Sequence, residues 1–263
     1  MKVGLLTGTG TYSISGAASG PETVATPYGD ALVSRGELSG IELLHIARHE
    51  QGHARLSNHV CHRANVYALR RLGAECALGV SVCGAVDPGV PLGSLVVFDD
   101  LHFLANRLGD GSLCTFHDTS GDPERGHWIF DRPFSGAVRR ALLEACSELD
   151  HPFLEEGCYG HVDGPRFNSR AEVRSLALAG VTAISQTCGP EAVLCGEIEL
   201  PYAVLGYVTD YANGVRETPP DPADLVRRVA ASSAAVWAVI QRALPRLEAT
   251  HPASAGMVYR FGS

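Results

Sequence analysis

Residues 77–82 read ALGVSV, an apolar run of strand length in which hydrophobic side chains are nearly continuous. A strand buried on both faces has this pattern, because helices cover both sides of a parallel sheet. Four further segments are of similar character: Val3–Leu6, Leu43–Ala47, Leu95–Phe98 and Tyr202–Thr209. We therefore predict a mostly parallel, mixed sheet with covered faces.

Helical patterns alternate with these runs along the chain. They are Arg63–Leu72, Phe134–Leu149, a capping-box pattern of Ser169 and Glu172 that opens a helix through Leu178, a helix entry at Thr187–Pro190, and a helix from Asp221-Pro222 with an apolar stripe to Leu244. This alternation predicts an α/β fold, a single-domain sandwich with a mixed central sheet flanked by helices. We assign residues 1–245 to this domain and the weakly patterned residues 246–263 to a C-terminal tail.

The charge balance of the chain is acidic. Its 263 residues include 21 lysines and arginines and 29 aspartates and glutamates, for a net charge of −8. Such a balance argues against nucleic acid or an anionic membrane as a partner. No window approaches the roughly 18 unbroken apolar residues of a membrane span, and the N-terminal MKVGLLTGTG has too short an apolar run for a secretion signal. We expect a cytoplasmic protein without a membrane partner.

The cysteines and histidines lack the spacings of metal sites. The eight cysteines contain no CxxC pair, and several lie in apolar runs, such as Cys83 and Cys146. In an intracellular chain such cysteines are expected to be small buried thiols rather than disulfides or zinc ligands. The eleven histidines contain no HExxH motif. We therefore expect no metal and no cofactor.

Polar residues follow the apolar runs where the predicted strands end. They are Gly8-Thr9-Gly10, Arg48-His49, Ser81, the segment Asp163–Asn168, and Thr209-Asp210. Glycines let backbone amides approach an anion, and arginine beside histidine supplies hydrogen-bond donors. Ligands of α/β proteins gather outside the carboxyl ends of the strands, so these loops are expected to form one pocket. The alternatives are a tight turn without a ligand at Gly8 and a surface ion pair between Arg48 and Glu50.

Seven motifs, in this order, resemble a known family. They are TGTGTY (7–12), TPYG (26–29), ARHEQGH (47–53), HRAN (62–65), VDGPRFNSRAE (162–172), QTCGPEAVL (186–194) and VTDY (208–211). They are similar to 5′-methylthioadenosine phosphorylase within the trimeric purine nucleoside phosphorylase family, over about residues 1–245. The resemblance implies a nucleoside-phosphorylase-like α/β sandwich and a homotrimer. It also implies phosphate-dependent cleavage of the N-glycosidic bond, with inorganic phosphate as co-substrate and free purine and a ribose 1-phosphate as products.

The resemblance also assigns roles to residues at matching positions. The phosphate-binding residues are Thr9, Arg48, His49, Ser81, Val82 through its amide, and Thr187. The ribose lies near Gln186 and His53, and the base contacts Phe167, Asn168 and Asp210. Asp210 faces N7 of the purine as the catalytic residue, either as a protonated donor or as an ionised acceptor for a 6-amino group. His127 of a neighbouring subunit would complete the pocket for the 5′ group.

The chain also departs from the family pattern. Gln186 stands where methylthioadenosine phosphorylases carry methionine, and Ala212 stands where they carry a second aspartate. Near the phosphate loop, Glu50 and Ser57 replace the family's usual glycine and proline. Glu50 would repel phosphate unless it points away or pairs with an arginine.

These departures leave alternatives open. The enzyme could be a phosphorylase for 6-oxopurine nucleosides or methylthioinosine, in place of one for a 5′-methylthioadenosine-like substrate. It could instead be a hydrolytic nucleosidase or a biosynthetic relative that acts on an unusual nucleoside. A third hypothesis is a nucleoside-binding protein without catalysis. Phosphate discriminates the first group from the second, because only a phosphorylase needs it for base release.

Overall fold

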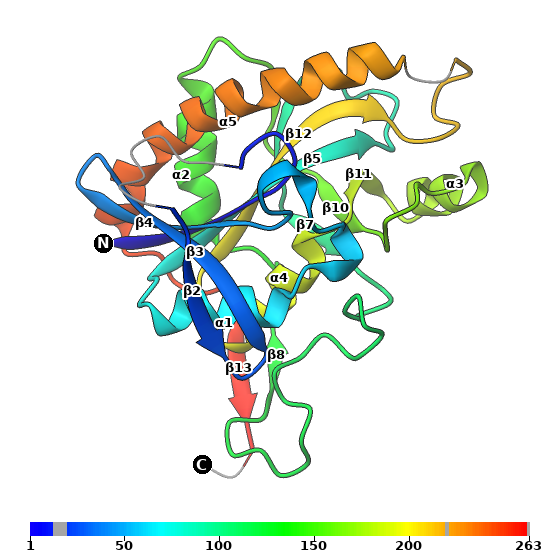
Figure 1. The fold of residues 1–263 in the computed structure, drawn as a ribbon. Coiled ribbons are helices and arrows are strands. Elements are labelled where there is room, and N and C mark those ends of the chain that lie inside the picture. Colours follow the sequence, from blue (N-terminus) through cyan, green and yellow to red (C-terminus); the bar gives the residue numbers. More distant parts are fainter. Residues whose placement is uncertain (13–19, 219–220, 262–263) are drawn as a thin grey trace.

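A mixed sheet forms the centre of the computed structural model, which describes residues 1–12, 20–218 and 221–261 (Figure 1). Eleven strands of the described residues belong to it: β1 (Lys2–Thr7), β2 (Glu22–Thr26), β3 (Gly29–Leu38), β4 (Ile41–Ala47), β5 (Cys76–Ala85), β6 (Leu95–Val97), β7 (Asp100–His102), β9 (Phe153–Leu154), β10 (Cys158–His161), β11 (Val181–Ser185) and β12 (Tyr202–Tyr211). Their main order is β2-β3-β4-β1-β5-β11-β10-β7, while β12 pairs with β5 and β6. The predicted mixed sheet is confirmed.

Strand β5 organises the sheet. Strands β1 and β12 both run parallel to it, with Val3 opposite Cys76 and Tyr202 opposite Ala77. Strand β4 runs parallel to β1, so that Ala47 lies opposite Thr7. Since β1, β4, β5 and β12 point the same way, the loops that follow them meet at one edge of the sheet.

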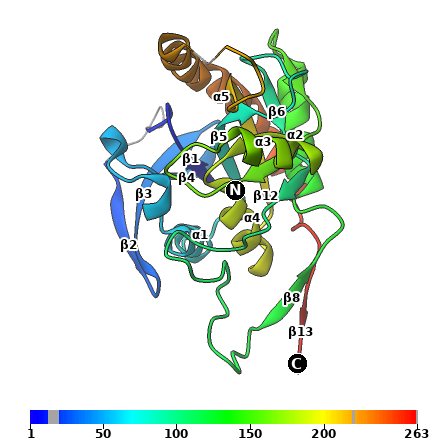
Figure 2. The same cartoon turned by 90° about the vertical axis from the view of Figure 1, so that its right-hand side faces the viewer.

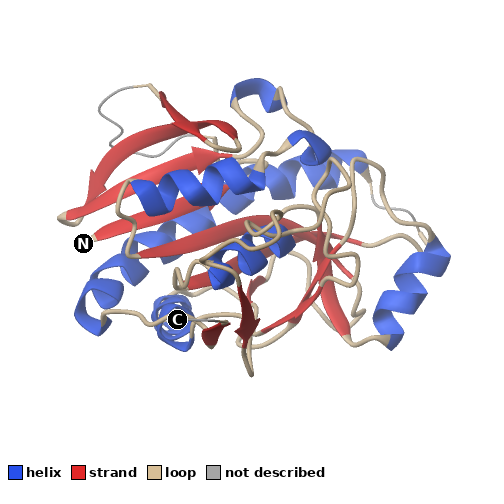
Figure 3. Ribbon diagram, turned by 90° about the horizontal axis from the view of Figure 1, so that it is seen from below, coloured by secondary structure: helices blue, strands red, loops and turns tan. Residues whose placement is uncertain are grey.

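Helices cover both faces of the sheet, as Figures 1 and 2 show and as Figure 3 shows from below. They are α1 (His62–Arg71), α2 (Gly136–Ser147), α3 (Arg170–Leu178), α4 (Cys188–Glu197) and α5 (Pro222–Thr250). Helices α2 and α5 pack together on one face, and α1 and α4 pack together on the other. The predicted capping box is confirmed, because Ser169 and Glu172 exchange both side-chain-to-backbone hydrogen bonds at the start of α3.

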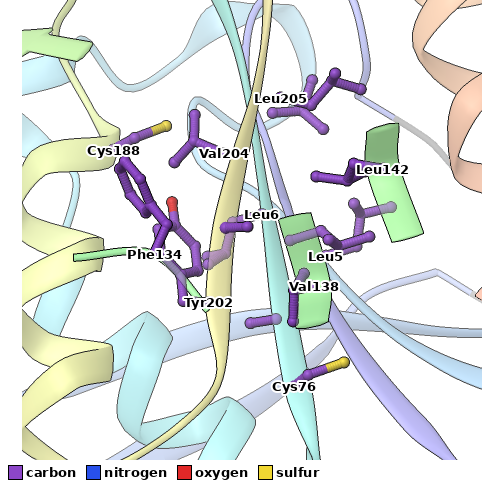
Figure 4. Packing of buried hydrophobic residues seen from close by; sticks show 14 of the residues in the cluster. Leu5, Leu6, Cys76, Phe134, Val138, Leu142, Cys188, Tyr202, Val204 and Leu205 are labelled. Carbon is purple, nitrogen blue, oxygen red and sulfur yellow. The ribbon is translucent and has the colours of Figure 1, made fainter. Parts of the chain in front are cut away.

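The core lies between the sheet and these helices. Figure 4 shows Leu5 and Leu205 on the strands beside Val138 and Leu142 of α2. All four are at most 1% exposed. A fully buried aliphatic side chain of this size contributes about 1.5–3 kcal/mol to folding. The apolar runs of the sequence therefore form the layer that fixes the strand ends in place.

The C-terminal segment differs from the predicted tail. Helix α5 continues past residue 245 to Thr250, because the apolar stripe extends to the fully buried Leu247. Strand β13 (Met257–Arg260) then pairs antiparallel with β8 (Gly126–Ile129) in a separate two-stranded ribbon. Figures 1 and 2 show this ribbon projecting from the end of the molecule opposite α5. Residues 246–263 thus include a helix end and a strand, and residues 1–245 as the catalytic domain stay a prediction.

No helix in the described ranges combines the length and the apolar composition that crossing a membrane requires. The eight cysteines are all free thiols, six of them buried and Cys61 and Cys158 half-buried.

Candidate active site

A cavity of about 310 Å³ opens where the ends of β1, β4, β5 and β12 meet. The predicted site residues that line it are Thr9, His49, His53, Ser81, Val82, Phe167, Asn168, Gln186, Thr187 and Asp210. They come from segments between residues 9 and 210, and the fold brings together residues that the strand ends and the family resemblance predicted. Arg48 and His127 do not line the cavity.

One end of the cavity is a cradle at Gly8. A Cβ atom placed on Gly8 would lie 3.4 Å from Arg48 Nη1 and 3.6 Å from His49 Nε2. Glycine therefore leaves open a position at which a guanidinium and an imidazole converge. Such a position suits an oxygen of a small anion, because Arg48 is a charged donor.

Arg48 lies behind this cradle, with its side chain entirely buried. Its Nε and Nη2 donate to the two carboxylate oxygens of Glu191 at 2.5 and 2.7 Å, and its Nη1 donates to the carbonyl of Val80 at 2.7 Å. Tyr202 donates its hydroxyl to Glu191 Oε2 at 2.7 Å. The partner of Arg48 is thus Glu191 and not Glu50.

Arg48 and Glu191 each keep the other side chain ionised. Burial alone would raise the pKa of Glu191, but the Arg48 guanidinium, together with its hydrogen bonds, holds it well below its ordinary value. Burial acts against the charge of Arg48 as well, yet Glu191 raises the pKa of the guanidinium. Both groups are therefore ionised at neutral pH, and the cation stands directly behind the cavity.

His49 presents a lone pair to the cradle. Its Nδ1 lies 2.9 Å from the carbonyl oxygen of Arg55, which only accepts, so Nδ1 carries the hydrogen. Burial, reinforced by nearby Arg48, lowers the pKa of His49 to about 4, although the Arg55 carbonyl opposes this. At neutral pH its Nε2 is therefore an acceptor. The ring stacks on His53 with centroids 4.3 Å apart, and Tyr12 contacts His53 Nδ1 at 3.1 Å.

Hydroxyl groups line the cavity beside the cradle. Ser81 donates to the hydroxyl of Ser185 at 2.8 Å, and both residues line the cavity with Thr187. The backbone amides of Thr187 and Cys188, at the start of α4, donate to the phenol oxygen of Tyr159 at 3.4 and 3.1 Å. The amides are therefore engaged, and the side-chain hydroxyls are the groups that face the cavity.

Gln186 forms the adjoining wall in a fixed orientation. Its Oε1 accepts from the hydroxyl of Ser57 at 2.7 Å, and its Nε2 donates to the carbonyl of Arg166 at 3.2 Å. A Cβ on Gly164 would lie 2.1 Å from both Gln186 Oε1 and Ser57 Oγ, so only glycine fits against this pair. The two departures Gln186 and Ser57 thus act as a unit.

The opposite end of the cavity combines an aromatic ring and a carboxyl group. Phe167 lies at the mouth and is 65% exposed, so it is not a residue of the hydrophobic core. Asp210 is half-buried, and burial raises its pKa, while a hydrogen bond from Thr209 at 2.8 Å acts in the other direction. Asn213 donates to the carbonyl of Asn168 at 2.8 Å, beside the small side chain of Ala212.

Glu50 and His127 have their own surroundings. Glu50 pairs with Arg55 at 2.6 Å. Because an arginine balances its charge, Glu50 need not repel a phosphate in the cavity. His127 lies on β8, exposed, with its ring edge-on to Phe261. It does not line the cavity of its own chain, so its contribution to a neighbouring subunit stays a prediction.

Other residues that build the site lacked a clear signal in the sequence. Ser185 stood next to a predicted residue, and Leu225 and Val229 of α5 form an apolar wall. Leu225 and Val229 belong to the apolar stripe that the sequence predicted for this helix. Glu191 is fully buried in the first turn of α4, where glutamates are commonly exposed.

Comparisons with known proteins agree with this geometry. A profile of the phosphorylase superfamily matches residues 2–244. A probable 6-oxopurine nucleoside phosphorylase of Thermococcus kodakarensis is 34% identical over 228 residues, which are 85% of this chain and 84% of that protein. The S-methyl-5′-thioadenosine phosphorylase of Pyrococcus furiosus is 32% identical over 251 residues, 94% and 93% of the two chains.

The fold likewise has a counterpart among solved structures. Methylthioadenosine phosphorylase from Schistosoma mansoni in complex with adenine superposes with a TM-score of 0.84 at 24% identity. The match covers 94% of this chain and 92% of that chain. The predicted fold class is confirmed.

Proposed function

The chain belongs to the phosphorylase superfamily, and from that premise we propose that it cleaves the N-glycosidic bond of a purine nucleoside with inorganic phosphate. The products are free purine and a ribose 1-phosphate, as expected of a pentosyltransferase. The observation that carries the proposal is the Gly8 cradle, where Arg48 Nη1 and His49 Nε2 converge at one end of the same cavity that holds Phe167 and Asp210.

The chemistry explains why both ends are needed. Departure of the purine from C1′ leaves oxocarbenium-like positive charge on the sugar and negative charge on the base. A phosphate oxygen held near C1′ stabilises that cation and forms the new C–O bond as the C–N bond breaks. The cradle supplies the phosphate position, and the hydroxyl groups of Thr9, Ser81 and Thr187 surround it.

The neutral state of His49 suits a phosphate that still carries a hydroxyl hydrogen. Near neutral pH, phosphate is a mixture of the monoanion and the dianion, and even the dianion keeps one hydroxyl hydrogen. The unprotonated Nε2 accepts that hydrogen, while Nδ1 stays engaged with Arg55. Arg48 faces the charged oxygens through Nη1, whose second hydrogen is not taken by Val80.

Asp210 acts at the leaving base. Its pKa is raised by burial, which favours the protonated acid. A carboxylic acid donates to N7 of the purine and stabilises the electrons left on the base, which an ionised carboxylate does not. Phe167 supplies a stacking surface at the mouth, and Asn168 lies at the edge of the base.

The substrate is a purine nucleoside with an apolar 5′ group in this proposal. Leu225 and Val229 give the cavity an apolar wall. The second candidate is a 6-oxopurine nucleoside. Ala212 favours it, because no carboxylate is available there for a 6-amino group, and the Thermococcus relative bears that name.

We further propose a homotrimer in the cytoplasm. The ribbon of β8 and β13 exposes Ile129, Phe130, Met257 and Tyr259, which are 43–56% exposed, and it carries His127. Covering this ribbon with a neighbouring subunit removes apolar surface from water and brings His127 to that subunit's 5′ pocket. Eight free thiols suit a reducing compartment.

The test is base release from 5′-methylthioadenosine, adenosine, 5′-methylthioinosine and inosine, each with and without phosphate. Release that requires phosphate supports the proposal, and the preferred nucleoside identifies the 6-substituent and the 5′ group. Release at the same rate without phosphate indicates hydrolysis. Tight binding without release from any of the four favours a binding protein.

A further inference from the structure

A second cavity of about 270 Å³ shares a wall with the nucleoside cavity. Ser57 and Gln186 line both, and the hydrogen bond between them stands in the shared wall. The second cavity also reaches Asn58 of the 3-10 turn before α1, His62 of α1, His161 at the end of β10, and Asp163 after it. A volume near 300 Å³ is the lower end of the range for small-molecule sites and exceeds the roughly 30 Å³ of one water.

Three polar atoms without a partner belong to residues that line this cavity. Asn58 Oδ1, His62 Nδ1 and His161 Nδ1 are buried and have no hydrogen-bond partner among the described residues. His62 is only 4% exposed, and its Nδ1 lies 3.6 Å from Glu191 Oε1, too far for a hydrogen bond. Buried polar groups are nearly always satisfied, so the occupant of this cavity must supply partners for these atoms.

The charges of the lining do not select an anion. Asp163 is negative and Arg107 is positive, and Arg107 Nη1 donates to the carbonyl of Gly111. Burial lowers the pKa of His161 to about 3, so its ring is neutral at pH 7. The amide oxygen of Asn58 accepts hydrogen bonds, and the Nδ1 of a neutral imidazole donates or accepts according to its tautomer. Hydroxyl groups, which both donate and accept, match this set.

We propose that the second cavity is a subsite for a hydroxyl-bearing group on the sugar of the nucleoside, such as a second pentose linked through a ribose hydroxyl. The Ser57–Gln186 pair is the gate between the two sites. This rests on the proposed function, which puts the ribose beside Gln186. The gate opens when the Ser57 hydroxyl releases Gln186 Oε1, and the substituent then reaches Asn58, His62 and His161.

Binding of ligands in the absence of phosphate tests this subsite independently of turnover. The probes are adenosine and adenosine with a ribosyl group at O2′ or at O3′, and the readout is Kd by calorimetry. The wild-type protein is expected to bind one ribosylated nucleoside at least as tightly as adenosine. Asn58→Leu removes an unpartnered oxygen and keeps a similar side-chain volume. It should raise the Kd of that ligand about tenfold and leave the Kd of adenosine within twofold.

Two further variants sharpen the test. His59 is the exposed neighbour of Asn58 and does not itself line the cavity. His59→Leu should therefore leave all Kd values unchanged. Ser57→Ala removes the hydrogen bond that closes the gate and should lower the Kd of the ribosylated ligand a few-fold.

The subsite is refuted if adenosine binds but neither ribosylated nucleoside does, or if Asn58→Leu weakens both ligands equally. Either result would leave a cavity that holds water only. The same titrations are run with inosine and its ribosylated forms. Absence of binding by both adenosine and inosine would instead refute the proposed function, so the two failures are distinct.

Discussion

The two ends of the nucleoside cavity are built in different ways. At the phosphate end, Arg48 and Glu191 are entirely buried and joined by two hydrogen bonds, with Tyr202 as a third partner. At the sugar and base end, Phe167 is 65% exposed and Gln186 is half-buried. The family departures Gln186 and Ala212 both lie at this second end. Under the proposed function, the comparison assigns the reaction to buried groups of the core and the choice of substrate to side chains near the surface.

The largest effect is expected from Glu191→Gln, which leaves the Arg48 charge buried without its partner. Breaking a buried pair in this way should lower the free energy of unfolding by about 3–5 kcal/mol. Urea unfolding measures it. Because the pKa of Glu191 is lowered in the folded state, its contribution is complete above the ordinary glutamate pKa and is lost as pH falls below it.

A double variant separates stability from phosphate binding at this end. Arg48→Met with Glu191→Leu removes both charges, so much of the lost stability should return. The KM for phosphate should stay raised, because no guanidinium remains behind the cradle. Recovery of a wild-type KM for phosphate would show that Arg48 has a structural role only.

Gly8→Ala should remove phosphate-dependent turnover without unfolding the protein. The added methyl group fills the cradle at ordinary contact distances of 3.4 Å or more, so the melting temperature should hold. The loss in kcat/KM for phosphate should be about 10²-fold, comparable to removing a donor that stabilises a transition state. Steady-state kinetics with varied phosphate measures it.

Gly84→Ala is the matched control at the base end. Its methyl group would lie 3.6 Å from Asp210 Oδ2, and the variant should alter the KM for nucleoside but not for phosphate. Equal changes in the phosphate KM for both alanine variants would contradict the division of the cavity into two ends.

Asp210→Asn should reduce turnover of 6-aminopurine nucleosides about tenfold, the value of one hydrogen bond of 1.4 kcal/mol, and spare 6-oxopurine ones. The protonated acid exists below its pKa, which burial raises. Wild-type kcat should therefore fall as pH rises through that pKa. The asparagine variant should lack this limb. A pH profile of kcat for adenosine and inosine decides it, and an equal loss for both would remove Asp210 as the selector.

Gln186→Met should have the smallest effect. The change restores the family's residue but deprives Ser57 and Arg166 of their hydrogen bonds to the amide. We expect the ratio of kcat/KM for a nucleoside to kcat/KM for its 2′-deoxy form to change a few-fold, while the KM for phosphate stays unchanged. A shift in the phosphate KM would place Gln186 at the other end of the cavity.

The sequence predicted the central strands and the helices because their apolar patterns are long and uninterrupted. It did not predict the β2–β3 hairpin, whose strand β2 is largely exposed, or the short strands β10 and β11. Thr9 and His49 follow β1 and β4, and Asp210 lies near the end of β12, so the strand-end rule predicted that they converge. This rule predicts that residues at the ends of parallel strands lie close together, from the order of the strands alone. Their roles were predicted from the family resemblance.

The parts of the site that escaped prediction depend on burial. Arg48 was expected at the cavity surface, but Glu191, 143 residues away, and the carbonyl of Val80 hold it behind the cradle. No local pattern reveals that partner. Gln186 and Ser57 were recognised as departures, yet their hydrogen bond exists only because the bare Gly164 lets both side chains meet.

The most direct test of the phosphate cradle is ³¹P NMR of the wild-type protein with inorganic phosphate and its preferred nucleoside. Our account predicts a ribose 1-phosphate resonance that grows in equal amount to the purine released, and growth about 10²-fold slower with Gly8→Ala. Release of purine with free ribose and an unchanged phosphate signal would contradict it.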